Sequence, residues 1–290
     1  MGFPLELKPK PKSLLWKCNG TIGLMRPVAG RVQMVGTELK FNGVGTELKV
    51  NGVRCRAGHF SNDAVGDLSD NLQQQATLQQ LRSARIIACL RASSSKLALD
   101  AARAALDGGL AVLEVTMNTP QAAQVIKVLV REYPSAIIGA GTVLSTKEAD
   151  LAKDAGAKFL MSPVTVEEIV HYHRNGPVVH IPGAMTPTEV ISAYNFGAPA
   201  VKLYPMSLLG GVPFMRTLSK PLGHIPMIPS NGVCLDTVEP YISAGAMAVI
   251  LSEAIFEKSS LEKNDMGRIQ KLASAAVLRT TSCQSNLIPS

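Results

Sequence analysis

The chain has 290 residues, of which 46% are hydrophobic and 18% charged, a balance that fits a protein with a sizeable core. No apolar run approaches the roughly 20 residues of a membrane-spanning helix, and the five scattered cysteines, without a CxxC pair, form neither a disulfide framework nor a metal signature. The net charge of +7 lies within residues 1–60, which carry ten Lys and Arg against three Asp and Glu, whereas residues 61–290 carry nineteen of each. The body of the chain therefore predicts no nucleic-acid surface.

The N-terminal segment is basic, poor in acids and without the apolar period of a helix. This composition is typical of an organelle transit peptide, and residues 53–57 (VRCRA) resemble the cleavage region of plastid transit peptides. Residues 1–57 are therefore predicted to be a transit peptide that directs the protein to the plastid stroma. A basic tail or a misassigned start codon is the alternative, and it would leave the protein in the cytoplasm.

A tandem repeat lies within this segment, with VGTELKFNG at residues 35–43 and VGTELKVNG at 44–52. Asn42-Gly43 between the two alternating runs favours a tight β-hairpin, but a lone two-stranded hairpin is marginal in water. The segment is therefore predicted to be disordered, and the repeat is interpreted as a duplication without function. Residues 58–82, rich in Asp, Asn, Gln and Ser, are predicted to be a linker leading into a helix over 72–83.

From residue 84 onward, short apolar runs alternate with amphipathic segments. The apolar runs predict eight buried strands, at residues 85–90, 111–115, 136–140, 158–161, 178–181, 200–204, 226–228 and 247–251. Helices are predicted between them, at residues 95–107, 119–131, 145–155, 165–174, 186–195 and 236–243. Capping signals support four of the helices: Thr119 before Pro120, Ser145 with Glu148, Thr165 with Glu168, and Thr186 before Pro187 with Glu189.

Eight strand–helix units over about 200 residues predict a (β/α)8 TIM barrel. We expect a single barrel domain over residues 83–282, followed by a tail at 283–290. The competing architecture is a doubly wound open sheet, which usually opens with a glycine-rich fingerprint after its first strand. Here the first predicted strand runs into Leu90-Arg91-Ala92-Ser93, which has no such fingerprint.

Lys202 is the most informative residue, because it lies within the apolar strand AVKLYP at residues 200–205. Burial disfavours the ammonium form of a lysine, and a neutral amine in a dry pocket is what a Schiff-base nucleophile needs. An isolated strand lysine more often snorkels to solvent. Glu114 is the second unusual residue, since an acid flanked by Val112, Leu113 and Val115 is costly unless it is paired or functional.

The active site of a TIM barrel lies at the carboxyl ends of its strands. A lysine and a carboxylate that meet there form either a buried ion pair or an amine with its proton shuttle. The other strand ends supply further candidates: Arg91, Thr116, Asn118, Thr142, Pro163, Gly183, Ser230, Asn231, Gly232, Ser252 and Glu253.

Five motifs occur in order at these ends: LEVT at 113–116, IGAGTVL at 138–144, IPG at 181–183, VKLYP at 201–205 and GG at 210–211. Together they resemble the 2-keto-3-deoxy-6-phosphogluconate/4-hydroxy-2-oxoglutarate aldolase family over about residues 80–257. The resemblance implies a class I lyase on a (β/α)8 barrel, without metal or cofactor and commonly trimeric. It implies cleavage of 2-keto-3-deoxy-6-phosphogluconate, or its galactonate epimer, to pyruvate and glyceraldehyde 3-phosphate.

The resemblance also implies roles for individual residues. Lys202 would form the Schiff base, and Glu114 would shuttle protons. Thr142 would hydrogen-bond the pyruvate carboxylate, although a helix-entry cap is an alternative role for it. Gly183 and Pro163 would border the substrate, with Gly183 leaving room for it.

Three positions depart from the family pattern. Asn118 stands where some gluconate-type members have Arg, and Asn118-Thr119-Pro120 is closer to the galactonate-type branch. Arg91 is then the better anion-binding candidate, with a surface arginine as the alternative. The family's Gly-Gly and Gly-Ser turns become Asn231-Gly232 and Leu251-Ser252, which leaves phosphate binding by Ser230, Asn231, Gly232 and Ser252 open.

Three alternatives to that activity follow from the same residues. Cleavage of 4-hydroxy-2-oxoglutarate would need no phosphate pocket. A non-catalytic barrel that binds a keto acid would not need both Lys202 and Glu114. An isomerase or epimerase on a phosphate-binding barrel would not need a lysine in the sixth strand.

Overall fold

In the computed structural model of the chain, side chains are described for residues 69–279, and secondary structure for residues 14–18, 21–28, 31–34, 37–39, 47–50, 53–57 and 62–285. The chain divides into two compact units, Met1–Ser69 and Asp70–Ser290. The residues predicted to form the barrel lie in the second unit. Each unit is described below by itself.

The first unit contains a six-stranded antiparallel sheet with the strand order β4-β3-β2-β1-β6-β5. In chain order the strands β1 to β6 are Leu14–Cys18, Thr21–Val28, Arg31–Met34, Thr37–Leu39, Glu47–Val50 and Val53–Ala57. This differs from the predicted disordered extension. The prediction considered only a single two-stranded hairpin, which is marginally stable in water, whereas three or more strands in one sheet stabilise each other.

The two copies of the tandem repeat occupy opposite edges of this sheet. In the first copy, Thr37–Leu39 (β4) pairs with β3, and in the second, Glu47–Val50 (β5) pairs with β6. The two copies therefore do not form a hairpin with each other, in contrast to the interpretation of Asn42-Gly43 as its turn. Asn42-Gly43 itself lies outside the described residues.

Helix α1 (Asn62–Ala84) begins before the second unit and continues into it, and it starts earlier than the predicted helix. All eight predicted strands follow, and β12 is an additional short one. Strands β7 to β15 are Ile86–Leu90, Val112–Thr116, Ile137–Gly141, Phe159–Met161, Val179–Ile181, Gly183–Ala184, Val201–Leu203, Met227–Pro229 and Val249–Leu251.

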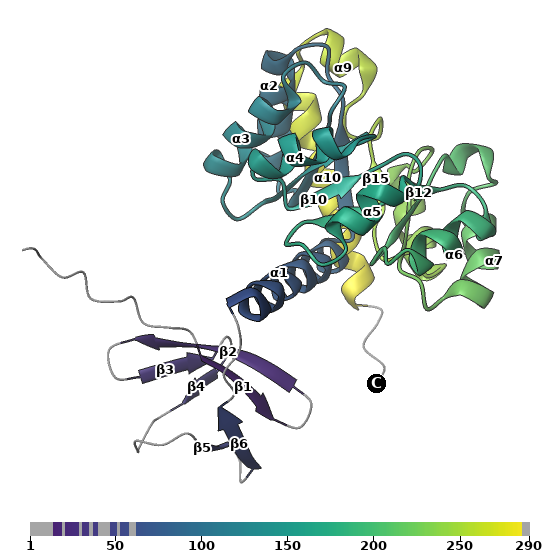
Figure 1. The fold of residues 1–290 in the computed structure, drawn as a ribbon. Helices are drawn as coiled ribbons and strands as arrows, with labels where there is room; N and C mark the ends of the chain where they lie inside the picture. The colour runs from purple at the N-terminus through teal and green to yellow at the C-terminus, as the bar shows by residue number, and fades with distance from the viewer. Residues whose placement is uncertain are drawn as a thin grey trace, which may run out of the picture. The chain divides into compact units, whose positions relative to one another are not determined.

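These strands are parallel and form a curled sheet of the TIM-barrel kind (Figure 1). One segment has the order β11-β10-β9-β8-β7-β15, and the other has the order β12-β13-β14. A parallel bridge between Ser230 and Ile250 joins β14 to β15, and only Pro182 separates β11 from β12. The carboxyl ends of all these strands therefore converge on one end of the sheet, where the sequence places the candidate site.

Helices alternate with the strands and lie on the outside of the sheet (Figure 1). Helices α2 to α6 are Ser95–Asp107, Ala122–Glu132, Thr146–Asp154, Glu167–His173 and Pro187–Asn195. Helices α7 to α10 are Val212–Leu222, Val238–Ser243, Lys258–Glu262 and Met266–Ser285, and two short 3-10 helices are Met206–Leu208 (η1) and Leu235–Thr237 (η2). The sequence did not predict α7, α9 or α10.

Two of the predicted helix starts are confirmed in atomic detail. The hydroxyl of Ser145 accepts a hydrogen bond from Glu148 N at 3.2 Å, and the hydroxyl of Thr186 accepts one from Glu189 N at 3.3 Å. The Glu189 carboxylate returns a bond to Thr186 N and completes the capping box. These bonds satisfy backbone N–H groups that lack a partner within the helix.

Two other predicted caps are wrong because the hydroxyls bond elsewhere. Helix α3 begins after Gln121, whose φ of 57° is left-handed, and the Thr119 hydroxyl instead accepts a bond from Ala92 N at 3.3 Å. The Thr165 hydroxyl donates to the carbonyl of Gly183 at 2.9 Å, and α5 has no side-chain cap. Both threonines therefore tie loops together at the end of the sheet that carries the site.

The core of the second unit has two layers. Because successive side chains of a strand point to opposite faces, one set of residues meets on the concave side of the sheet and the other packs under the helices. The inner layer draws one or more residues from nearly every strand and includes Ile87, Val112, Ile137, Phe159, Met161, Val179, Ile181, Ala200, Ile228 and Ile250. Leu81 of α1 joins this inner layer and is fully buried.

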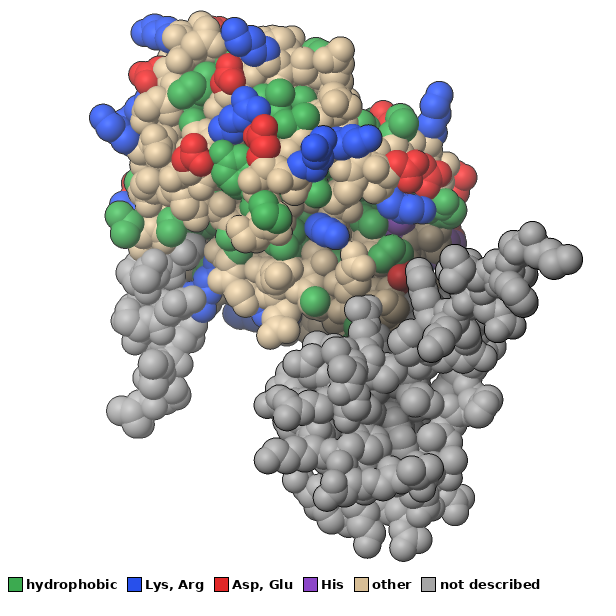
Figure 2. Space-filling view, turned by 90° about the vertical axis from the view of Figure 1, so that its left-hand side faces the viewer, with side chains coloured by type: hydrophobic (Ala, Val, Ile, Leu, Met, Phe, Trp, Pro, Cys, Tyr) green, Lys and Arg blue, Asp and Glu red, His purple; other side chains and the backbone are tan. Residues whose placement is uncertain are grey.

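The described surface shows no segregation of charge on the face drawn in Figure 2, where Lys and Arg side chains alternate with Asp and Glu. Among the described residues, no helix is both long and apolar enough to cross a bilayer. That part of the chain also contains no group of three or more His, Cys, Asp or Glu side chains placed to hold a metal ion.

Candidate active site

Lys202 lies at the centre of β13 and points into the inner layer. It has the same strand parity as Ala200, and it is only 6% exposed. Its backbone is fixed on both sides by parallel pairing, with Gly183 of β12 and Ile228 of β14 as partners. The strand that carries the amine is therefore fixed within the sheet by its pairing on both sides. The snorkelling alternative does not describe this residue.

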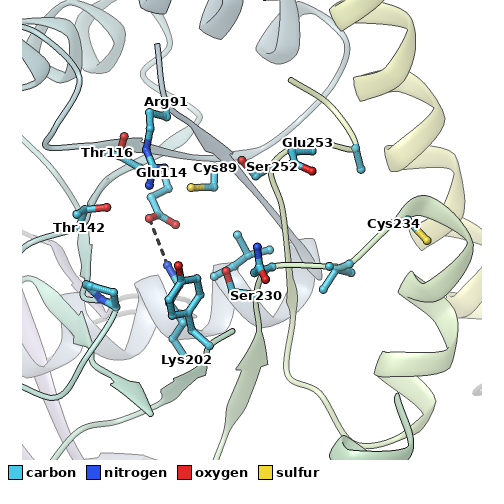
Figure 3. A pocket seen from close by; sticks show the side chains of 17 residues that line it. Cys89, Arg91, Glu114, Thr116, Thr142, Lys202, Ser230, Cys234, Ser252 and Glu253 are labelled. Atoms are coloured by element: carbon cyan, nitrogen blue, oxygen red, sulfur yellow. Dashed lines mark ion pairs between the residues drawn. The ribbon is translucent and has the colours of Figure 1, made fainter. Parts of the chain in front are cut away.

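Glu114 in β8 is fully buried and has the same parity as Val112 of the inner layer. Its Oε1 lies 3.6 Å from Nζ of Lys202 (Figure 3). Neither carboxylate oxygen has a hydrogen-bond partner among the described residues. A buried ion pair of this kind is poor for stability, because removing both charges from water costs several kcal/mol per ion. The pair leaves both groups free to bond a substrate that enters between them.

Gly141 at the end of β9 gives the carboxylate its room. A Cβ added to Gly141 would overlap Oε1 of Glu114 and lie 2.7 Å from its Cγ. Any larger residue at this position would displace the carboxylate. The glycine-rich run at 138–142, which carried the family resemblance, is thus explained by a direct contact with the reactive pair.

Cys89 lies beside Glu114 on the neighbouring strand β7 and was not predicted as a site residue. Burial, with the negative charge of Glu114 as the next cause, raises the pKa of its thiol far above its ordinary value. Cys89 is therefore a neutral thiol next to the carboxylate and not a nucleophile. Strand alternation could have found it, since it lies two residues from Ile87 of the inner layer and two from Arg91.

The pair opens into a cavity of about 580 Å³ at the carboxyl ends of the strands (Figure 3). The cavity brings together eleven of the predicted candidates: Arg91, Glu114, Thr116, Thr142, Pro163, Lys202, Ser230, Asn231, Gly232, Ser252 and Glu253. It also contains residues that the sequence analysis did not single out for this site, namely Cys89, Tyr204, Val233, Cys234, Ile250 and Ala254.

Asn118 and Gly183 do not line this cavity. Asn118 is exposed on the loop between β8 and α3. A Cβ on Gly183 would overlap the backbone of Pro163, so this glycine permits two backbone segments to approach each other rather than leaving room for a substrate. Sequence spacing placed both residues near strand ends but could not show which way the loops turn.

Thr142 lines the cavity from the loop after β9 with a left-handed φ of 57°. Helix α4 begins after Ser145, so Thr142 is not its cap. The unusual backbone turns Thr142 away from the strand path, a conformation that is rare for a β-branched residue and is often found at functional sites. Arg91, an exposed residue, lines the same cavity and lies beside Glu114 in Figure 3.

The far end of the cavity is built from the loops after β14 and β15. Asn231 and Gly232 both have positive φ, 71° and 78°. The hydroxyl of Ser207 donates to the Asn231 side-chain oxygen, and Ser207 N bonds its carbonyl at 3.1 Å. The oxygen atoms of Asn231 are therefore engaged in holding the loop, and this side of the cavity also presents the hydroxyls of Ser230 and Ser252, the carboxylate of Glu253 and backbone N–H groups.

The matches to known proteins agree with this geometry. The family model for KDPG and KHG aldolase matches residues 78–272. The KHG/KDPG aldolase of Escherichia coli (strain K12) is 32% identical over 180 residues, which cover 62% of this chain and 84% of that protein. The 2-dehydro-3-deoxy-phosphogluconate aldolase of Dickeya dadantii (strain 3937) is 31% identical over 184 residues, covering 63% and 86%.

Solved structures give the same result. A Legionella pneumophila KDPG aldolase, with pyruvate captured as a covalent carbinolamine intermediate, superposes with a TM-score of 0.64 and 25% identity over 70% of this chain and 97% of its own. A structure of native KDPGal gives a TM-score of 0.62 and 28% identity, over 69% and 96%. By family match, fold and site, this chain is an aldolase and belongs to the KDPG and KHG aldolase family.

Proposed function

We propose that this protein cleaves a 2-keto-3-deoxy sugar acid to pyruvate and an aldehyde through a Schiff base on Lys202. The observation that carries the proposal is the buried pair of Lys202 and Glu114, 3.6 Å apart, with no other hydrogen-bond partner for the carboxylate in the described part of the chain. The names of relatives such as 2-dehydro-3-deoxy-phosphogluconate aldolase support this substrate class.

The first half of the reaction forms the Schiff base. Glu114 accepts a proton from the ammonium group of Lys202, and the freed amine attacks the C2 keto carbon to give a carbinolamine. Glu114 then returns a proton to the carbinolamine hydroxyl, which leaves as water. The iminium that results draws electrons from the adjacent C3 carbon.

The second half breaks the bond between C3 and C4. Glu114 takes the proton of the C4 hydroxyl, the C4 oxygen becomes the aldehyde carbonyl, and the electron pair of the C3–C4 bond moves into the enamine. Protonation at C3 and hydrolysis of the iminium release pyruvate and restore Lys202. Thr142 and Arg91 line the same cavity as Lys202, which supports the proposal that they bond the carboxylate of the pyruvate half.

Cleavage of 4-hydroxy-2-oxoglutarate is a second candidate, because it uses the same steps at C2, C3 and C4. The printed name of the Escherichia coli relative, KHG/KDPG aldolase, favours it. A non-catalytic keto-acid-binding barrel fits less well, since binding alone would not require a buried amine paired with a buried carboxylate.

Reductive trapping tests the proposal directly. The purified protein is incubated with pyruvate and borohydride, and its intact mass and peptides are measured. We expect an adduct with the mass of pyruvate less one oxygen, located on Lys202, and no adduct in Lys202→Met. A folded wild-type protein that gains no mass would contradict the proposal. Lys220, an exposed lysine of α7, provides the matched control as Lys220→Met, which should trap like wild type.

Three finer proposals accompany the activity. We count β11 and β12 as one strand interrupted at Pro182, which makes the sheet a closed (β/α)8 barrel; the bridge between Ser230 and Ile250 supports this count. A homotrimer is supported by the resemblance and by a protein cage designed by fusing symmetric oligomeric domains, which matches this chain with a TM-score of 0.63. Sedimentation equilibrium tests the trimer.

Residues 1–57 are proposed to act as a plastid transit peptide on the strength of their composition. Fusion of these residues to a fluorescent protein tests this, with import into plastids as the expected result. Fluorescence that stays in the cytoplasm would contradict it and favour the alternative of a basic tail.

A further inference from the structure

We infer that Ser162 and His180 position Thr142 for substrate binding, through a buried hydrogen-bond chain that ends on the carbonyl of the residue after it. The inference rests on the proposed function, in which Thr142 bonds the carboxylate of the pyruvate half. Neither Ser162 nor His180 lines the cavity of the reactive pair. Both are therefore positioning residues, which act on the substrate only through the loop that carries Thr142.

The backbone of Thr142 needs support from its surroundings. Its φ of 57° is left-handed, and a β-branched residue rarely occupies this region unless neighbouring groups fix the chain there. Thr142 lines the cavity, and its side chain points toward the reactive pair in Figure 3. If the loop relaxed to an ordinary backbone conformation, this side chain would leave its position. The groups that fix the loop therefore control how Thr142 meets a substrate.

Three hydrogen bonds fix the backbone of this loop. The Gly141 carbonyl accepts the first from Met117 N at 2.7 Å. Val143 N donates the second to the Met161 carbonyl at 3.1 Å. The Val143 carbonyl accepts the third from the hydroxyl of Ser162 at 2.6 Å. The first two bonds join backbone groups, which every variant keeps, so the Ser162 hydroxyl is the member of the three that a side-chain substitution removes.

His180 sets the direction of the Ser162 hydroxyl. Nε2 of His180 lies 2.9 Å from Oγ of Ser162, and both side chains are buried. A hydroxyl has one proton to donate, and Ser162 donates it to the Val143 carbonyl, so Oγ must accept from Nε2–H of His180. Burial lowers the pKa of His180, which keeps the ring neutral near pH 7 with a single N–H. Nδ1 has no partner among the described residues, which agrees with a proton on Nε2 alone.

This hydrogen-bond chain lies on the outer side of the sheet, away from the reactive amine. Val179 and Ile181, on either side of His180 in β11, belong to the inner layer, so His180 points to the opposite face, under the helices. There its ring faces His173 of α5, with 6.4 Å between the ring centroids. A substitution in the chain should therefore disturb Thr142 and leave Lys202 in place.

Reductive trapping of two ketones on Lys202 tests the inference. Pyruvate has the carboxylate that Thr142 bonds, whereas acetone lacks it but forms the same kind of iminium. The half-saturating concentration of each ketone is measured by intact mass, with cyanoborohydride as the reductant. We expect Ser162→Ala to raise the value for pyruvate about tenfold, which corresponds to one lost hydrogen bond to a charged group. The value for acetone should stay within about twofold of wild type, since no bond to it is lost.

A double variant separates positioning from a general loosening of the structure. If Ser162 acts through Thr142, the substitutions Ser162→Ala and Thr142→Ala are coupled and their effects do not add. The double variant should then bind pyruvate as weakly as Thr142→Ala alone. Independent effects would instead multiply, to about a hundredfold in the half-saturating concentration of pyruvate.

Two substitutions of His180 keep the inference testable even if Ser162→Ala does not fold. The amide of His180→Gln can replace the ring N–H as a donor, whereas His180→Leu has no donor. We expect His180→Leu to raise the half-saturating concentration of pyruvate about threefold or more, and His180→Gln to stay near wild type. Ser274→Ala is the matched control, because the Ser274 hydroxyl also donates to a loop carbonyl, that of Gly108 at 3.0 Å, and does not line the cavity. It should match wild type with both ketones.

Three outcomes would overturn the inference. The first is a folded Ser162→Ala that changes both ketones equally or neither of them. The second is a double variant in which the two effects multiply, and the third is His180→Leu indistinguishable from His180→Gln. Each of these leaves the proposed function intact, provided that wild type traps pyruvate on Lys202. A folded wild type that traps neither ketone would refute the proposed function and the inference with it.

Discussion

Gly141→Ala is the sharpest test of how the reactive pair is held. The added Cβ would overlap Oε1 of Glu114, and the side chain it pushes is fully buried, so the carboxylate must leave its position 3.6 Å from Lys202. Gly141 is not among the residues with positive φ, so the backbone itself accepts alanine. The substitution therefore acts through one contact, between a single new methyl group and a catalytic carboxylate.

The expected magnitude follows from two known effects. Inserting a methyl group into a packed interior costs about 1–3 kcal/mol of stability, and loss of a positioned general acid–base lowers the rate by about 10²–10⁴-fold. We expect Gly141→Ala to fold with a lowered melting temperature and to lose at least about 100-fold in kcat, with a smaller change in KM. Thermal unfolding and steady-state kinetics measure the two effects separately.

The matched control is Gly176→Ala. Gly176 has no positive φ, and the nearest atom to its added Cβ is the carbonyl oxygen of His173 at 3.9 Å, an ordinary contact. This variant should keep wild-type activity and stability. If Gly141→Ala retained kcat within about twofold of wild type, the carboxylate would have another productive position, and its placement by Gly141 would be refuted.

Two stability predictions follow from groups outside the cavity. Burial, with the charge of His173 as a smaller cause, lowers the pKa of His180 from 6.5 to about 3. Between these two pH values the unfolded chain takes up a proton that the folded chain does not. The contribution of His180 to the free energy of unfolding is therefore full above pH 6.5 and falls by up to about 1.4 kcal/mol per pH unit as the pH drops toward 3. Urea unfolding between pH 7 and 4 should show this slope, and a His180→Gln variant with an equal slope would contradict it. Thr186→Ala should lower the free energy of unfolding by about 1 kcal/mol, because α6 loses its N-terminal cap. Thr165→Ala is the control, since Thr165 does not cap α5. If Thr165→Ala increased amide hydrogen exchange at the start of α5, the cap assignments would be wrong.

The reactive pair could be predicted from sequence because it depends on strand periodicity alone. Lys202 and Glu114 each interrupt an apolar run, and parallel strands bring equivalent positions to the same end of the sheet. Cys89 was missed, because it resembles any small buried residue until its neighbour is known.

The predictions that failed concern residues in the loops that follow the strands. Asn118 and Gly183 follow strands in sequence, yet one is exposed and the other contacts the Pro163 backbone. Thr119 has the sequence of a helix cap, but its hydroxyl accepts a bond from Ala92 N, a contact between loops 27 residues apart. Such choices depend on which partners the folded loops offer, and short-range patterns do not contain that information.

Leu81 packs against the inner layer from α1 and is fully buried. The cavity of the reactive pair, in the described part of the chain, is lined from the carboxyl ends of the strands, so we expect ligands to enter and leave at that end. Pyruvate, bonded to Lys202 at depth, then lies behind the aldehyde. We therefore expect ordered departure: the aldehyde diffuses out first and pyruvate second. In the synthetic direction the keto acid must load before its aldehyde partner, and product-inhibition patterns will report that sequence of events.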